Sequence, residues 1–147
     1  MEKDQLVEKL KSILATAFSL SLKAQNYHWN VVGENFGEYH QFFGEYYESV
    51  SDYVDMYAEH IRQLGSFAPG SLARYSELSK VSDEVSIPSA KFMFVRLGSD
   101  NRLFSDMLID MREAAETFGD YGLVNTLEDA IRFHSKMQWM IDARTEG

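Results

Sequence analysis

Apolar residues recur at intervals of three, four and seven along most of the chain, which is the period of helices that bury one face. We predict a first helix from Lys3 to about Val31 and a second from Asn35 to Gly65. Their apolar stripes are Leu6, Leu10, Leu14, Phe18, Leu22 and Trp29 in the first, and Phe36, Tyr39, Phe43, Tyr46, Val50, Tyr53, Tyr57, Ile61 and Leu64 in the second. At the start of the second helix, Asn35 followed by Glu38 is close to a capping box.

The two prolines, Pro69 and Pro88, leave the chain on either side free to form long uninterrupted helices. We predict a third helix from Ser89 to Phe118 and a fourth from Asp120 to about Arg144. The segment SLARYSELS between the prolines is expected to form a short helix of its own. This pattern predicts an all-α fold, an antiparallel four-helix bundle with a short extra helix in the crossover between the second and third helices.

Composition narrows the possible functions. With 147 residues, of which 45% are hydrophobic, the chain can bury one core, so we expect a single domain over residues 1–147. No apolar run is long enough to span a membrane and the N-terminus lacks a secretory signal, so we expect a soluble, cytoplasmic protein. Because the chain has no cysteine, any metal must be bound by His, Asp, Glu or Tyr.

The chain is strongly acidic, with 23 Asp and Glu against 14 Lys and Arg and a net charge of −9. Such a charge repels nucleic acid unless the few cations cluster. They do not, since Lys3, Lys9 and Lys11 are offset by neighbouring acids. Nucleic-acid binding is therefore the least favoured of the functions considered.

The sequence between Lys23 and Arg62 contains no Lys or Arg at all. Six acids of the second helix form a stripe along one face, with spacings of seven. The window contains His28, His40 and His60 and the acids Glu34, Glu38, Glu45, Glu48, Asp52, Asp55 and Glu59. The stripe is either a solvated acidic face or a surface that collects hard cations, with ligands suited to iron, manganese or zinc.

Asp55 and Glu59 are one helical turn apart, the spacing that offers two carboxylates to one cation. His40 lies fifteen residues earlier, a rise of roughly 22 Å along the helix, and cannot share a metal with them. Either the histidines are unrelated to the carboxylates, or a second copy of the chain brings the two ends together. A two-fold pairing of the second helices would place His28 and His40 of one subunit beside Asp55 and Glu59 of its partner.

The segment YHWNVVGENFGEYHQFFGEYYESVSDYVDMYAEHIRQLG resembles the signature of the DNA-protection-during-starvation (Dps) proteins, or mini-ferritins. The shared features are H-W-N, then G-x-N-F, then a histidine, then D-x-x-x-E. The resemblance is dense over residues 25–65, and HSKMQWMIDA is similar to the family's closing helix.

The resemblance implies a ferritin-like bundle that assembles through dimers into a hollow homododecamer. It implies an iron-storage protein and ferroxidase that oxidises Fe(II) to Fe(III) with hydrogen peroxide or oxygen, stores ferric mineral and protects against oxidative stress. The iron site, holding one or two ions at the dimer interface, matches His28, His40, Asp55 and Glu59, with Trp29 beside it. Trp29 as a protective electron donor and Trp29 as a packing residue are both open.

The chain departs from the family at Gly44, where many members have an aspartate four residues after the second histidine. The second iron position is then weaker, or is supplied by Glu45 or Glu48. The family's DNA binding often depends on a lysine-rich tail, which this sequence lacks, so we do not expect DNA binding. Acidic pore residues of the family have counterparts at Asp120, Glu128 and Asp129.

The remaining candidates carry weaker expectations. Glu45, Glu48 and Asp52 are either metal-collecting ligands on a cavity wall or solvated acids. His60 points off the proposed ligand face and is assigned no metal role, and His134 is expected to be a buried, hydrogen-bonded histidine. A rival hypothesis is a metal-binding shell or scaffold that has lost efficient ferroxidase turnover, which Gly44 alone favours.

Overall fold

The computed structural model describes residues 2–145, which contain five helices and no strand. The helices are α1 (Lys3–Asn30), α2 (Phe36–Gln63), α3 (Leu72–Leu78), α4 (Ala90–Phe118) and α5 (Tyr121–Thr145). The predicted all-α fold is confirmed, and each long helix begins and ends within two residues of its predicted bounds. Within residues 2–145, none of the helices combines the length and apolar content needed to cross a membrane.

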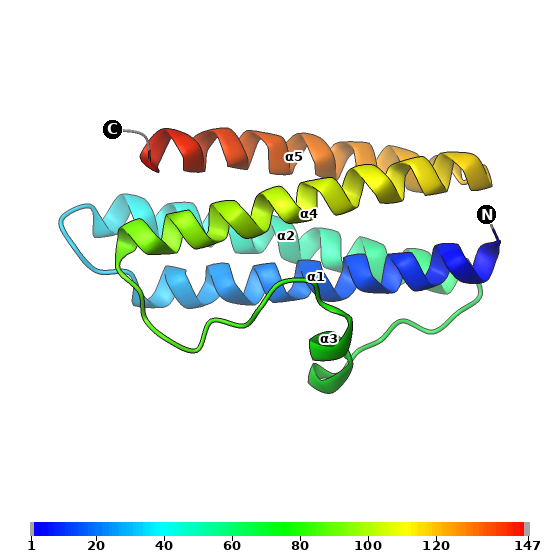
Figure 1. Cartoon of the computed structure of the whole chain (residues 1–147), viewed down its shortest axis with the longest axis horizontal. Coiled ribbons are helices and arrows are strands. Elements are labelled where there is room, and N and C mark those ends of the chain that lie inside the picture. Colours follow the sequence, from blue (N-terminus) through cyan, green and yellow to red (C-terminus); the bar gives the residue numbers. More distant parts are fainter. Residues whose placement is uncertain (1, 146–147) are drawn as a thin grey trace.

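The long helices form two antiparallel pairs, α1 with α2 and α4 with α5 (Figure 1). Contacts of α1 with α4 and of α2 with α5 close the four-helix bundle. The crossover between α2 and α4 runs back along the outside of α1 and carries α3 (Figure 1). There the Tyr75 ring of α3 stacks on Phe18 of α1, with 4.4 Å between ring centroids.

The predicted apolar stripes form most of the core, but Leu22, Trp29 and Phe36, which they also included, are exposed. Leu6, Leu10, Leu14 and Leu20 line it from α1, and Phe43, Tyr46, Val50, Tyr57 and Ile61 line it from α2. Burying one such side chain contributes about 1.5–3 kcal/mol. The opposite face of α2 is left exposed, and this is where the acidic residues lie.

The predicted capping box at the start of α2 is wrong. Asn35 does occupy the N-cap position, but its backbone (φ −101°, ψ 28°) is not extended and its side chain makes no capping hydrogen bond. Its amide lies 3.4 Å from the Tyr39 hydroxyl instead. Glu38 turns to Arg144 of α5, with 3.1 Å between charged atoms. A contact across the bundle has replaced the local one.

A polar cluster crosses the bundle core around Asn101, which is fully buried. The Asn101 side-chain oxygen accepts hydrogen bonds from the Tyr46 hydroxyl (2.8 Å) and from Nδ1 of His134 (2.6 Å). Its amide donates to the His134 carbonyl and to Gln138. His134 is buried and bonded as expected, but its Nε2 has no partner within residues 2–145. Burial without a countercharge lowers the pKa of His134 to about 3.

Glu84 ties the crossover to the last turns of α1. Its carboxylate accepts hydrogen bonds from the Tyr27 hydroxyl (2.7 Å) and from Arg96 of α4 (2.8 Å), and its carbonyl accepts one from Asn26. Partial burial raises the pKa of Glu84, but the hydrogen bonds from Tyr27, Arg96 and Ser86 outweigh it and lower the pKa to about 2. The end of α1 is therefore held to the crossover and, through Arg96, to α4.

We predict that Glu84 makes stability depend on pH in the acid range. Because its folded pKa lies below the ordinary value of 4.5, its contribution is present above that pH and is lost as the pH falls toward 2. Glu84→Gln should lower the urea midpoint at pH 7 and flatten the loss of stability below pH 4.5. Glu77→Gln, at an exposed pair with Arg74, is the control and should keep the wild-type pH profile. An unchanged profile for Glu84→Gln would contradict the prediction.

We predict that His134 makes the free energy of unfolding depend on pH below 6.5. Its folded pKa of about 3 lies below the ordinary 6.5, so the unfolded chain takes up a proton between these values and the folded protein does not. Stability should therefore fall as the pH drops from 6.5. His134→Gln, which retains a donor for Asn101, should reduce the slope of unfolding free energy against pH by one proton between pH 6.5 and 4.5. Equal slopes for both proteins would contradict the assignment.

Candidate metal centre

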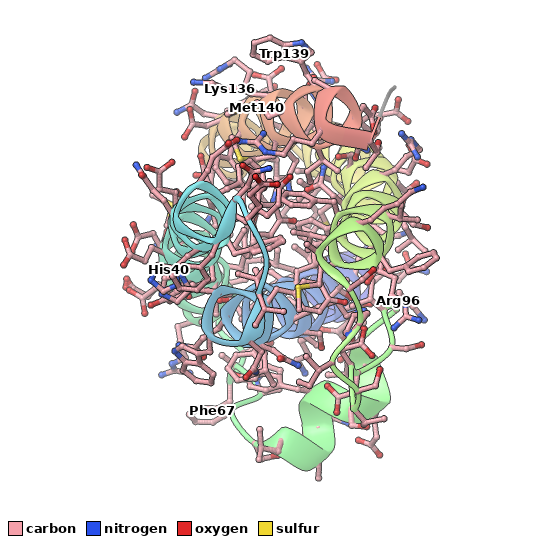
Figure 2. All side chains as sticks on the ribbon, turned by 90° about the vertical axis from the view of Figure 1, so that its left-hand side faces the viewer. His40, Phe67, Arg96, Lys136, Trp139 and Met140 are labelled. Carbon is pink, nitrogen blue, oxygen red and sulfur yellow. The ribbon has the colours of Figure 1, made fainter. Side chains whose placement is uncertain are left out.

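The candidate site begins at the short turn that joins α1 to α2. His28 lies in the last turn of α1 and His40 in the second turn of α2. Between them Gly33 has φ +125°, a backbone conformation that residues other than glycine rarely adopt. The turn brings the end of α1 against the start of α2, and Figure 2 shows His40 at the outer surface of the bundle beside α1.

The two imidazoles hold each other in place. Nδ1 of His28 lies 2.6 Å from the carbonyl oxygen of His40, and Nδ1 of His40 lies 2.6 Å from the carbonyl oxygen of His28. The rings stack with centroids 3.8 Å apart and an interplanar angle of 16°. The ring of Tyr47 contacts His28 edge-on, with centroids 5.4 Å apart.

This reciprocal bonding sets the tautomer of both rings. A carbonyl oxygen only accepts, so each Nδ1 must carry the proton. In the neutral form, Nε2 of each ring is then left with a free lone pair, which is the state in which imidazole binds a metal ion. Neither Nε2 makes a hydrogen bond to the rest of residues 2–145. The pair can therefore offer two nitrogen ligands.

Asp55 and Glu59 form the second half of the predicted site. Both are exposed and lie one turn apart on α2, as the sequence predicted. α2 is one continuous helix from Phe36 to Gln63, so the fifteen residues from His40 to Asp55 separate them by roughly 22 Å. Within residues 2–145, no three His, Asp or Glu side chains gather closely enough to hold a metal ion. The fold brings together each predicted pair of ligands, but not the two pairs.

The predicted acidic stripe is present on α2, with one correction. Glu38 does not stand unpaired in it, because Arg144 of α5 forms a salt bridge with it. Glu45, Glu48 and Asp52 are all exposed, and Glu45 accepts a hydrogen bond from Gln41 at 3.1 Å. Trp29 is 62% exposed at the end of α1, so it does not pack in the core of this chain.

Other predicted residues have bonding partners elsewhere in the bundle. His60 lies 2.5 Å from Asp120, whose other oxygen caps the start of α5 by accepting from the amide of Leu123. This contact ties the end of α2 to α5. Two further pore candidates are also paired: Glu128 with Arg112 and Asp129 with Arg132. Their role as pore residues remains a prediction.

Gly44 has a neighbour that the sequence does not reveal. The sequence predicts only the loss of a carboxylate there, whereas Gly44 is buried against the imidazole of His28. The one signal available was its position four residues after His40, on the same helix face.

Comparison with known proteins agrees with this architecture. Residues 7–146 match the family model described as Ferritin-like domain. The DNA protection during starvation protein of Helicobacter pylori J99 is 31% identical, over 92% of this chain and 95% of that protein. The crystal structure of Dps from Staphylococcus aureus superposes with a TM-score of 0.94 at 29% identity, covering 98% of this chain and 97% of that chain.

A further crystal structure of the same fold, DPS protein from Vibrio cholerae O1, has a TM-score of 0.94 at 25% identity over 98% of this chain and 91% of that chain. That protein is described as a member of a broad superfamily of ferritin-like diiron-carboxylate proteins. The chain therefore belongs to the ferritin-like domain family and, within it, to the Dps mini-ferritins.

Proposed function

We propose that the protein stores and detoxifies iron by oxidising Fe(II) at sites shared between two subunits. Each site would take His28 and His40 from one subunit and Asp55 and Glu59 from its partner. The observation that carries the proposal is the mutually locked imidazole pair with two free Nε2 atoms. Membership of an iron-storing family supports it.

The chemistry of these groups suits Fe(II) as substrate. Two carboxylates offset the charge of the ion, and two neutral imidazoles complete a shell of borderline ligands. The side chains bind and orient the ion, and the electrons pass to hydrogen peroxide. Two Fe(II), one hydrogen peroxide and two protons give two Fe(III) and two water molecules. Trp29, exposed beside His28 in the chain, is proposed as a protective electron donor near the iron.

The higher charge of Fe(III) gives a reason for the oxidised ion to leave the imidazoles. Fe(III) prefers oxygen ligands to imidazole, and the exposed acids Glu45, Glu48 and Asp52 offer oxygen ligands along α2. We propose that these acids line the cavity of a hollow dodecamer and lead ferric product to a mineral core, in a protein of the cytoplasm. A two-fold pairing of α2 helices creates two equivalent sites in each dimer, which fits a shell built from dimers.

The rival function is a metal-binding shell without efficient turnover. It is favoured by the half of the site within one subunit, where residues 2–145 bring no carboxylate to the two imidazoles. DNA protection, named for the Helicobacter relative, is disfavoured for this chain by its net charge of −9.

The test of the shared site uses two inactive variants. We predict that purified wild type, loaded with Fe(II) without oxygen, forms ferric absorbance within seconds to minutes of peroxide or air addition. The doubly substituted His28→Ala/His40→Ala and Asp55→Ala/Glu59→Ala proteins should oxidise iron no faster than buffer. When the two variants are unfolded, mixed equally and refolded, about a quarter of the sites should regain all four ligands.

The controls separate the possible failures. Glu77→Ala, on α3, should oxidise iron as wild type does, since its side chain pairs with Arg74 away from the candidate ligands. No oxidation by wild type above the buffer rate would overturn the ferroxidase and leave the shell. Active wild type with no recovery in the mixture would overturn the sharing of ligands between subunits.

A further inference from the structure

Gly44 lies directly against the ring of His28. A Cβ atom built on Gly44 would be 2.9 Å from both Cε1 and Nδ1 of that ring, closer than real Cβ atoms approach. In this structure the His28 imidazole thus occupies the space that a side chain at position 44 would enter.

The backbone gives no reason for glycine at this position. Gly44 lies inside α2 and is not among the glycines with positive φ, which are Gly33, Gly65 and Gly119. Alanine is more favourable than glycine in a helix interior because it loses less conformational freedom on folding. Helix formation alone therefore favours replacing Gly44.

The His28 ring cannot move away without losing its contacts. Its Nδ1 bonds the carbonyl of His40, one turn before Gly44, and its face stacks on the His40 ring. A shift that accommodates a Cβ lengthens the 2.6 Å hydrogen bond and frees the ring to rotate. The tautomer and direction of the Nε2 lone pair are then no longer fixed.

We propose that Gly44 is a positioning residue of the metal centre, and this rests on the function proposed above. By leaving out a Cβ, it lets His28 reach the His40 carbonyl and so fixes the tautomer of the His28 ring and the direction of its Nε2 lone pair. No third His, Asp or Glu of residues 2–145 joins the pair to compensate for a loosened ring. The metal affinity of this half of the site therefore depends on the space at Gly44.

Gly37 provides a matched control on the same helix. It also lies in α2, but nothing stands within 4 Å of a Cβ built on it. Gly37→Ala and Gly44→Ala therefore add the same methyl group to the same helix, and only the second meets a candidate ligand.

The experiment is a titration of the purified, metal-free protein with cobalt(II), followed by its visible absorbance, alongside thermal unfolding without metal. Gly44→Ala should weaken cobalt(II) binding roughly 10–100-fold, the usual effect of losing a group that orients a ligand. Its metal-free thermal midpoint should lie no lower than that of His28→Ala, which loses the same hydrogen bond. Gly37→Ala should bind cobalt(II) as wild type does.

A second pair of variants tests whether Gly44 acts through His28. In a His28→Ala background, where no ring fills the space, Gly44→Ala should leave cobalt(II) affinity unchanged. An additive loss there would overturn the proposal, as would wild-type affinity in the single Gly44→Ala variant. A metal-free midpoint for Gly44→Ala below that of His28→Ala would assign Gly44 to general packing and also overturn it. Absence of cobalt(II) binding by wild type would instead remove the proposed function itself.

Discussion

The turn from α1 into α2 is the constraint on which the rest of the molecule depends. α1 ends at Asn30, so the carbonyl of His28 lies among the last four of the helix, which lack a helical amide partner. Nδ1 of His40 donates a hydrogen bond to this carbonyl, and Nδ1 of His28 donates one to the carbonyl of His40. The same two hydrogen bonds thus satisfy the carbonyl of His28 near the end of α1, link α1 to α2 and orient two imidazoles at the surface.

The sequence predicted those parts of the structure that depend on local chemistry. Pro69 and Pro88 lie outside the long helices, and the spacing of apolar residues identified most of their buried positions, because both signals act within a few residues. The prediction failed where a distant residue intervened. Glu38 was expected to cap its own helix but pairs with Arg144, 106 residues along the chain. No local pattern shows which of two partners a carboxylate will meet.

The polar residues of the interior show the same limit. Asn101 lies in register with Phe94, Leu97, Phe104 and Leu108, and this position in an apolar series was the one signal of its burial. The series does not reveal that Tyr46 and His134 approach from two other helices to bond it. Likewise the candidate ligand pairs were readable, since each pair is local or joined by a short turn. The steric role of Gly44 was not, because it depends on how closely α1 approaches α2.

Packing of its buried face explains how α2 tolerates the charge of its acidic face. Like charges one turn apart, as at Asp55 and Glu59, destabilise a helix by about 0.2–0.5 kcal/mol per pair. Burial of Tyr46, Val50 and Tyr57 on the opposite face contributes several times that amount, at about 1.5–3 kcal/mol for each large side chain. Packing therefore decides whether α2 forms, and the acidic face is free to carry uncompensated charge. A cation bound there relieves repulsion that folding has already overcome, so metal binding adds stability without being required for the helix to exist.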